Sequence, residues 1–478
     1  MNPVWIIQAT DFLAAFLFIY GLKRMSSPVT ARSGIRVAGY GMLLATLAGF
    51  LYVFGISDAA APHLAANLGL TLLALLVGVG WAWRSGKRVA LTDMPQMVAL
   101  YNGMGGGAAG AIAAVELLRG RPDSATHLAV TLVGAVIGSV SFSGSLVAWA
   151  KLDGRINKPW RVNGQHLYNA FALLVTLGVG IAVAVGVAGV PTHVLIAVFF
   201  GLALLYGVMA TMPIGGADMP VVISLYNALT GLAVGLDGFV LQSPALMIAG
   251  MVVGSAGTLL TLLMARAMNR SVSNVLFSNF GDVSLEHHGE IKGRMKPVEA
   301  SDAGVAMRYA GKVIIVPGYG LAAAQAQQKL YEFVKALQAA GVEVKFAIHP
   351  VAGRMPGHMD VLLAEAGVPY DLIAELDEVN DEFSSTDVAL VIGANDVVNP
   401  AARTDKTSPI YGMPILNVDY AHQVYVIKRG QGKGYAGVEN ELFYADNCNM
   451  IYGDARAVLV KMLQAVKDLG EEGAESAA

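Results

Sequence analysis

The sequence has little charge and almost no cysteine. Only 14% of its 478 residues are Asp, Glu, Lys or Arg, whereas soluble domains average roughly 25%. The single cysteine, Cys448, excludes an intramolecular disulfide framework and a multi-cysteine zinc or iron–sulfur site. No metal site and no nucleic-acid partner are expected.

Apolar residues make up 55% of the chain, and they gather in its first part. A helix needs about 20 apolar residues to cross about 30 Å of hydrocarbon. Nine stretches of that length occur, at 3–22, 35–56, 63–83, 93–118, 127–149, 165–188, 192–211, 219–241 and 244–265. The sequence therefore predicts a helical membrane domain, in contact with lipid, over residues 1–265.

Basic residues in the short connections predict the orientation of this domain. Thirteen Lys and Arg residues fall on one side, such as those at 84–88, and only Arg119 and Arg121 fall on the other. Cytoplasmic loops carry the excess of positive charge. We expect the amino terminus outside, the remainder of the chain in the cytoplasm, and a multi-pass protein of the inner, cytoplasmic membrane.

The rest of the chain has a different pattern. Residues 266–311 are polar and read as a connector, residues 312–470 alternate strand and helix, and residues 471–478 read as a disordered tail. Strands are predicted at 312–316, 342–348, 388–393, 413–418, 424–429 and 449–453, and helices at 321–340, near 358–367 and from Asp454. Such alternation is typical of a Rossmann-like parallel sheet covered by helices.

A glycine-rich turn follows the first predicted strand of this α/β region. Gly318-Tyr319-Gly320-Leu321-Ala322-Ala323 has the Gly-x-Gly-x-x-Ala pattern of a dinucleotide-binding turn. The alternative is a tight strand–helix turn without a ligand. Ordinary NAD sites carry an acid at the end of the second strand, but residues 342–348 run into His349-Pro350.

A basic pair, Lys428-Arg429, ends a later strand. Ammonium and guanidinium groups suit a 2′-phosphate, although the pair is equally compatible with a solvated strand end. Two further turns place glycine beside polar groups at strand ends, where ligands bind in such sheets. They are Val351-Ala352-Gly353-Arg354 and Gly393-Ala394-Asn395-Asp396; each alone is also ordinary turn chemistry.

The apolar part contains a short motif that occurs twice. Asp-Met-Pro, followed by Leu-Tyr-Asn, occurs at 93–102 and again at 218–227. An acid and a proline at these places are typical of a helix start, so Asn102 and Asn227 would lie about 13 Å into their spans. An amide at that depth is costly unless it is paired or hydrated.

Taken together, these motifs closely resemble the beta subunit of proton-translocating NAD(P) transhydrogenase. The resemblance extends to the segments 215–220, 274–277, 349–358, 434–437 and 453–455, and so covers nearly the whole chain. It implies nine spans and a cytosolic NADP(H)-binding domain in which the nucleotide lies reversed relative to an ordinary Rossmann site. It also implies that NAD(H) is bound by a partner alpha subunit, in an assembly that we expect to be a dimer of alpha–beta units.

The resemblance assigns roles to particular positions. It implies that 318–323 line the dinucleotide, that Val351, Ala352, Gly353 and Arg354 hold phosphate, and that Lys428 and Arg429 take the 2′-phosphate. Gly393, Ala394, Asn395 and Asp396 would lie near the nicotinamide, Tyr435 in a covering loop, and Gly453, Asp454 and Ala455 near the adenosine. For proton coupling our own hypothesis names Asp218, with Asp93 as a further candidate, because both lie at cytoplasmic helix ends, and we expect Asn102 and Asn227 to hold water in the path.

Three positions depart from the family pattern. Gly430 stands where relatives commonly have Ser, Asp360 where many have Asn, and Asn102 where some have a His proposed to carry the proton. An amide does not titrate near neutral pH, so another group must carry the proton. The rival hypothesis is a transporter or channel gated by a nucleotide-sensing domain, which would not catalyse hydride transfer.

Overall fold

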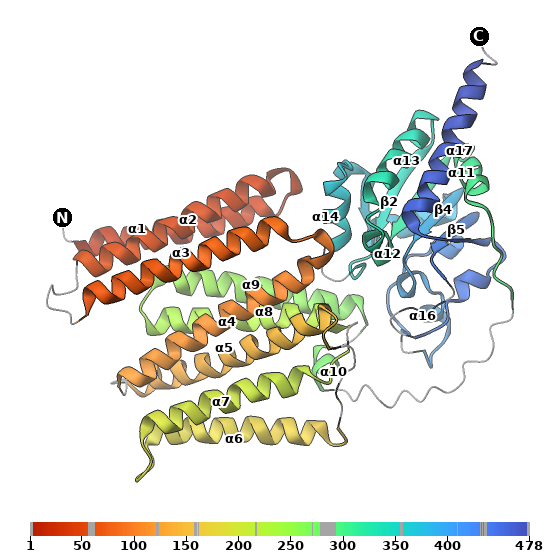
Figure 1. Cartoon of the computed structure of the whole chain (residues 1–478). Coiled ribbons are helices and arrows are strands. Elements are labelled where there is room, and N and C mark those ends of the chain that lie inside the picture. The colour runs from red at the N-terminus through yellow and green to blue at the C-terminus, as the bar shows by residue number, and fades with distance from the viewer. Residues whose placement is uncertain are drawn as a thin grey trace. The chain divides into compact units, whose positions relative to one another are not determined.

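A computed structural model of the chain describes residues 3–55, 63–120, 124–156, 160, 162–215, 218–269, 271–277, 293–353, 357–408, 410–430, 432, 434 and 437–475. The chain forms two compact units, each considered by itself below (Figure 1). The helical unit comprises Met1–Gly216 and Val222–Thr261, and the α/β unit comprises Ala217–Val221 and Leu262–Ala478.

Long apolar helices fill the first part of the chain. They are α1 (Pro3–Met25), α2 (Pro28–Gly55), α3 (Leu64–Arg88), α4 (Met94–Arg119), α5 (Ala125–Leu152), α6 (Gln165–Val185), α7 (Thr192–Thr211), α8 (Met219–Val240) and α9 (Pro244–Ala267). Within the described residues, eight of them, all but α2, are long and apolar enough to span a membrane, and α2 is itself 28 residues long. The prediction of a multi-span helical domain is confirmed.

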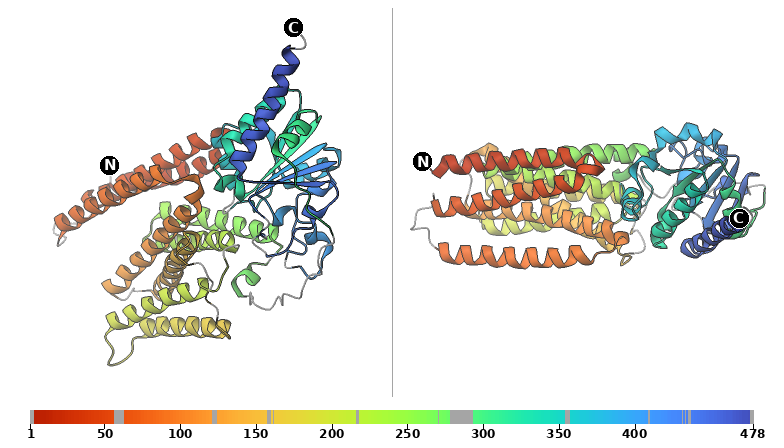
Figure 2. Two further views of the ribbon diagram at one scale, coloured as in Figure 1. Left: turned by 45° about the vertical axis from the view of Figure 1, so that its right-hand side comes forward. Right: turned by 90° about the horizontal axis from the view of Figure 1, so that it is seen from above.

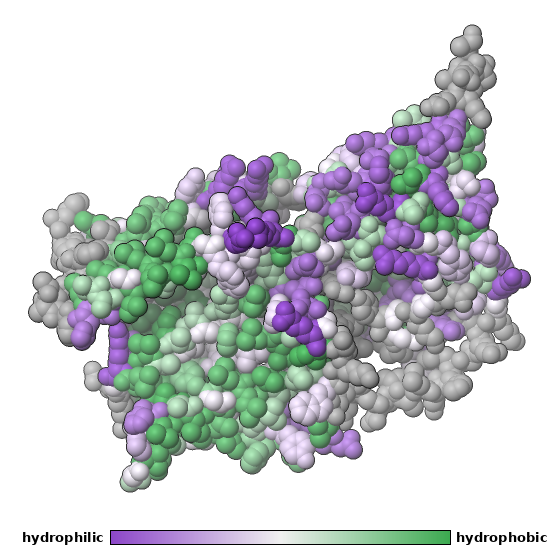
Figure 3. All heavy atoms as spheres, in the orientation of Figure 1, coloured by the Kyte–Doolittle hydropathy of each residue, from purple (hydrophilic) through white to green (hydrophobic). Residues whose placement is uncertain are grey.

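The helices of the helical unit run alongside one another (Figure 2). Apolar side chains dominate the visible surface of this unit, whereas hydrophilic residues are common over the α/β unit (Figure 3). Glycines allow the closest contacts between these helices. A Cβ built on Gly106 would lie 3.0 Å from the Gly138 carbonyl oxygen, and one on Gly235 would lie 3.7 Å from the Gly250 backbone. Small residues thus let backbones pack directly.

The α/β unit contains one six-stranded, fully parallel sheet in the order β3-β2-β1-β4-β5-β6. Its strands are β1 (Lys312–Pro317), β2 (Glu343–Ile348), β3 (Ile373–Glu375), β4 (Val388–Ile392), β5 (Gln423–Lys428) and β6 (Cys448–Tyr452). The order reverses between β1 and β4, which is the switch point where such sheets bind ligands. The predicted Rossmann-like sheet is confirmed.

Both faces of the sheet are buried. Successive positions along its strands are therefore apolar, and many of them are β-branched. On one face α11 (Ala300–Arg308) and α13 (Gln327–Ala339) pack against α17 (Ala455–Glu475) (Figure 1). On the other, Val316, Val391, Phe383 and the thiol-bearing Cys448 belong to a core cluster whose members are at most 8% exposed. The short helix α15 (Leu376–Val379) contributes Leu376 and Val379 to this cluster, whereas α16 (Ala401–Thr404) belongs to a separate apolar cluster.

Three local expectations differ from the structure. The helix predicted over 321–340 is divided into α12 (Tyr319–Ala323) and α13, because Gln325 adopts a left-handed φ of 49°. Residues 413–418 form no strand, and β3 was not predicted. In addition, α17 includes 471–475, which the sequence had suggested to be part of the tail.

The connector contributes to the sheet edge. It contains α10 (Val272–Phe277) and α11, and Pro297 forms an isolated parallel bridge with Met450 of β6. The Val298 N–H donates to the Met450 carbonyl at 3.0 Å, and the Met450 N–H donates to the Lys296 carbonyl at 2.8 Å. The connector therefore extends the ladder beyond β6.

Candidate functional site

Two glycine turns meet at the carboxyl edge of the sheet. A Cβ built on Gly318 would lie 2.5 Å from the Gly393 carbonyl oxygen, and one on Gly320 would lie 2.6 Å from the Gly393 Cα. Gly393 itself has a left-handed φ of 66°. The turns after β1 and β4 thus pack backbone to backbone, and only glycine permits that approach.

Hydrogen bonds join the same two turns. The Gly318 N–H donates to the Ile392 carbonyl at 2.9 Å, and the Gly320 N–H donates to the Gly393 carbonyl at 3.1 Å. Leu321 and Ala322 are buried. The glycines of the predicted fingerprint therefore have a structural cause in this chain, since they hold β1 and β4 together at the switch point.

The turn after β2 is organised by His349, which is 1% exposed. Burial lowers the pKa of His349 to about 4, against the opposing effect of a hydrogen bond to Pro414, so the ring is neutral near pH 7. Its Nδ1 accepts from the Val351 N–H at 3.2 Å. Nε2 therefore carries the proton and donates to the Pro414 carbonyl at 2.8 Å.

Gly353 continues this turn with a φ of 101°. A Cβ built there would lie 2.7 Å from His358, at the start of α14 (His358–Glu365). The Tyr319 ring lies 6.4 Å from the His358 ring, so the β1 and β2 turns are neighbours. The predicted phosphate ligand Arg354 lies outside the described residues. Asp360 is half-buried on α14, and burial raises its pKa.

Lys428 ends β5 beside the turn after β4. Its Nζ lies 4.5 Å from the centre of the Phe443 ring. Burial lowers the pKa of Lys428, and the negative charge of Asp396 partly opposes this. The Asp396 carboxylate packs against Gly434, where a Cβ would overlap it. Tyr435, predicted to cover the site, lies outside the described residues.

Arg429 extends toward β6. Its Nη2 lies 3.2 Å from Asp454 Oδ2, and both side chains are largely exposed. Asp454 Oδ1 accepts from the Arg456 N–H at 3.1 Å, which fixes it at the start of α17. The Gly453 N–H donates to the Lys428 carbonyl at 3.0 Å. The predicted residues at the ends of β5 and β6 are therefore neighbours.

Two buried asparagines, which the sequence analysis missed, support the turn after β4. Asn440 Nδ2 donates to the Asn395 carbonyl at 3.0 Å and to Asn395 Oδ1 at 3.1 Å. Asn399 Nδ2 donates to the Glu439 carbonyl, and its Oδ1 accepts from the Ala401 N–H. In the sequence, Asn399 and Asn440 look like ordinary loop residues. Only their burial in the structure identifies them as supports of this turn.

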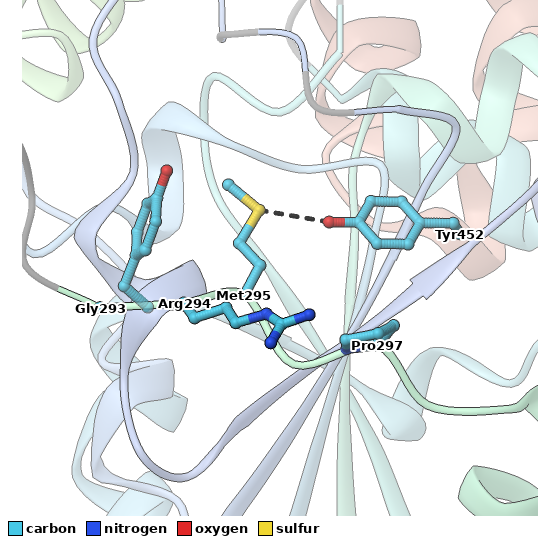
Figure 4. Close-up of a pocket in the computed structure, with 6 residues that line it drawn as sticks. Gly293, Arg294, Met295, Pro297 and Tyr452 are labelled. Atoms are coloured by element: carbon cyan, nitrogen blue, oxygen red, sulfur yellow. Dashed lines mark hydrogen bonds between the residues drawn. The ribbon is translucent and has the colours of Figure 1, made fainter.

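A pocket of about 360 Å³ lies where the connector passes β6. Gly293, Arg294, Met295, Pro297, Tyr444 and Tyr452 line it. The Tyr452 hydroxyl donates to the Met295 sulfur at 3.2 Å, and the Arg294 side chain lies below this pair (Figure 4). Tyr452 directly precedes Gly453, so this pocket adjoins the predicted adenosine end of the site.

The helical unit holds a separate row of polar contacts. Asn102 Nδ2 donates to Ser145 Oγ at 3.1 Å. Ser141 Oγ lies 2.5 Å from Thr230 Oγ1 and donates to the Tyr226 carbonyl at 2.9 Å. The amide of Asn102 is thus paired, as its predicted depth requires.

The other predicted membrane residues lie on α8 and α4. Asn227 is half-buried, and Asp218 is 3% exposed immediately before α8. Asp93 occupies the N-cap of α4, followed by Pro95 in the first turn, but its side chain makes no capping hydrogen bond. The predicted helix starts are correct, although side-chain capping at Asp93 is not.

Within the described residues, the structure therefore brings 318–323, 351–353, 393–396, 428–429 and 453–455 to one edge of the sheet, and it places Asn102 and Asn227 in the helical unit. The described part of the chain contains no group of three or more His, Cys, Asp or Glu that could hold a metal ion.

Comparison with known proteins identifies the family. The family model described as NAD(P) transhydrogenase beta subunit matches residues 7–465. The NAD(P) transhydrogenase subunit beta of Rhodospirillum rubrum is 43% identical over 475 residues, which covers 96% of this chain and 99% of that protein. A second sequence of that subunit, from a named strain of the same species, matches equally. This chain belongs to the NAD(P) transhydrogenase beta subunit family and is a multi-pass membrane subunit of a proton-translocating enzyme.

Proposed function

We propose that this chain binds NADP(H) at the carboxyl edge of its sheet and selects it over NAD(H) through Lys428 and Arg429. The observation that carries the proposal is the meeting of this basic pair with the two side-chain-free turns at Gly318–Gly320 and Gly393. The second strand, β2, ends at Ile348 and is followed by His349, so the sequence has no acid there that would favour a free ribose hydroxyl.

The chemistry of these groups fits a nucleotide that carries a 2′-phosphate. Lys428 and Arg429 provide an ammonium and a guanidinium group one residue apart, and phosphate prefers both. The Arg429 guanidinium is held by Asp454 at 3.2 Å, which orients it at the β6 side. Gly318, Gly320 and Gly393 leave a surface without side chains for the dinucleotide, with Arg354 and Tyr435 as additional proposed contacts.

When bound, NADP(H) supplies the hydride acceptor or donor. Asn395 and Asp396 would orient its nicotinamide end, and Asn440 fixes Asn395 through two hydrogen bonds. Since one fingerprint serves one nucleotide, a partner alpha subunit would supply NAD(H). We further propose that the assembly is a dimer of alpha–beta units.

Proton movement would be linked to nucleotide affinity through Asp218 and the connector. The excess of basic residues in the loops on one side of the helical unit supports a location of the chain in the inner membrane, with the α/β unit in the cytoplasm. One proton moving down 100 mV releases about 2.3 kcal/mol, enough to change a binding ratio more than tenfold. Asn102 and Asn227 would hold water along the route by hydrogen bonding.

The first test replaces both Lys428 and Arg429 by Ala in the complete alpha–beta complex. Loss of two charge-assisted contacts, each about 1.5–3 kcal/mol, should weaken NADPH binding more than a hundredfold and leave NADH binding unchanged. Lys335→Ala is the control, because Lys335 lies on the remote helix α13, over the Tyr331 ring. An unchanged preference for NADP(H) in a fluorescence titration would refute the 2′-phosphate role.

The second test replaces Asp218 by Asn in proteoliposomes. Hydride transfer from NADH to an NADP⁺ analogue should lose its dependence on the proton gradient, whereas the same reaction without a gradient should continue. Normal proton-linked rates would contradict the assignment. Solute flux with nucleotide binding but without hydride transfer in the wild type would instead favour the nucleotide-gated transporter.

A further inference from the structure

Asp237 is a buried carboxyl group in the helical unit that the mechanism above does not use. It lies on α8, 18 residues after Met219, or about 27 Å along the helix. The side chain is 2% exposed. Among the described residues, Asp218 and Asp237 are the carboxyl groups in the buried class. Asp218 directly precedes α8, whereas Asp237 lies within its last turn.

The surroundings of Asp237 offer little to stabilise a negative charge. Its Oδ2 has no hydrogen-bond partner in the described part of the chain. Its Oδ1 faces Gly134 of α5, where a built Cβ would lie 3.5 Å away. An ionised carboxyl is far more costly than a protonated one in such a place, so the site favours a bound proton.

The position of Asp237 aligns it with the polar row of the helical unit. Thr230 and Tyr226 precede it on α8 by seven and eleven residues, a spacing that puts all three on one helix face. Opposite them on α5, Gly134 and Ser141 are also seven residues apart. Since Ser141 contacts Thr230 at 2.5 Å, Asp237 and Gly134 meet two turns farther along the same interface.

The row continues away from Asp237 through groups that can donate and accept protons. The Tyr226 hydroxyl lies 2.5 Å from Thr211 Oγ1. Beyond it, Lys151 Nζ donates to the Thr211 and Ile214 carbonyls at 2.9 and 2.7 Å. Hydroxyl groups relay protons but do not change their protonation state near neutral pH. Ser141, Thr230, Tyr226 and Thr211 therefore cannot store a proton, whereas a carboxyl group such as Asp237 can.

Few other titratable groups lie on the elements packed around this end of α8. On α5, His127 lies seven residues beyond Gly134. On α4, Glu116 is paired with Arg119 at 3.3 Å. On α7, His193 is exposed. Opposite Gly238 on α9, the contact is apolar and formed by Met247.

We propose that Asp237 is a proton-binding residue of the transhydrogenase membrane unit, at the end of the polar row remote from the start of α8. Its carboxylate takes up one proton and releases it toward Thr230 and Ser141. The interval of two helical turns, about 10 Å, would be crossed through water that enters during transport.

The experiment uses the intact alpha–beta complex in proteoliposomes and compares Asp237→Asn with Asp237→Glu. The amide keeps the shape and removes the titratable group, so gradient-driven hydride transfer and dye-reported proton uptake should fall more than tenfold. The longer acid should retain most of both. Asp153→Asn is the control, because Asp153 is an exposed acid next to the end of α5, paired with Arg155 at 2.7 Å.

Infrared difference spectra distinguish proton binding from a structural role. The wild type should show a protonated-carboxyl band that is absent in Asp237→Asn and displaced in Asp237→Glu, with NADPH binding unchanged. If Asp237→Asn fails to assemble, the displaced carboxyl band of Asp237→Glu still decides whether the residue at position 237 binds a proton. Unaltered proton uptake in Asp237→Asn, or a carboxyl spectrum that neither substitution changes, overturns the proposal.

Discussion

The end of β5 carries glycine where relatives commonly have serine, and the structure shows that a side chain would fit there. Within the described residues, no atom lies within 4 Å of a Cβ built on Gly430, and its φ lies outside the left-handed region. We predict that Gly430→Ser tightens NADPH binding about tenfold, because one added hydrogen bond to a charged group contributes about 1.5–3 kcal/mol.

Isothermal titration of the complex with NADPH and with NADH checks this prediction. Gly430→Ala is the matched control, since it has the same backbone restriction and no hydroxyl. If the alanine variant gains as much affinity as the serine variant, the effect comes from the backbone and not from a contact with phosphate.

Because the pKa of His349 is lowered by burial, we predict that local stability around it depends on pH. Its pKa is about 4 when folded and about 6.5 when unfolded. Between these values the unfolded chain binds a proton that the folded chain does not. The free energy of unfolding should therefore fall as pH falls from 6.5 to 4, by about 1.4 kcal/mol per unit, and then level off.

Hydrogen exchange of the Val351 and Ala352 amides between pH 7 and pH 4.5, corrected for intrinsic exchange rates, measures this effect. His349→Gln should remove the dependence. His422→Gln should not, because the His422 side chain is 69% exposed. A loss of protection that is equal in wild type and His349→Gln would assign the pH effect to another group.

At the scale of elements, helix packing depends on a few glycines. A Cβ on Gly231 of α8 would overlap the Gly254 backbone of α9, whereas one on Gly201 of α7 meets no atom of the described residues within 4 Å. We predict that Gly231→Val lowers the melting temperature of the detergent-solubilised complex by several degrees, since overpacking costs about 1–3 kcal/mol. Gly201→Val should have no such effect; equal losses would contradict the packing argument.

Five of the strands could be predicted from sequence, because β1, β2, β4, β5 and β6 are short runs rich in β-branched, aromatic and other apolar residues, bounded by turns. Residues 413–418 show the same pattern and were predicted wrongly. Pro414 lacks an N–H for a ladder, and its carbonyl accepts from His349 at 2.8 Å instead. The break at Gln325 has no local signal, since its neighbours are strong helix formers.

The meeting of the predicted site residues at one edge of the sheet was also predictable, but the residues that support these turns were not. Asn440 and Asn399 have no distinctive spacing, and their roles depend on which loops fold over them. Asp237 is a single acid near the end of a span, where a residue at the membrane surface is equally expected from sequence. Its burial depends on Gly134, which is more than 100 residues away in sequence.

At the scale of the whole molecule, the orientation of the helices can be tested with single new cysteines. Ser26 lies between α1 and α2, and Ser124 lies before α5; both are exposed. We predict that a membrane-impermeant maleimide labels Ser124→Cys in intact cells and labels Ser26→Cys only after permeabilisation. The reverse result would invert the proposed topology, and the wild-type chain serves as the unlabelled control.

The wild-type chain should remain unlabelled because its only cysteine, Cys448, is buried. It is 0% exposed on β6, and burial raises the pKa of its thiol to about 12. Reactive thiols are accessible thiolates. The thiol of this subunit is therefore shielded from oxidants, and we expect the activity of the subunit to persist when accessible thiols elsewhere in the cell are oxidised.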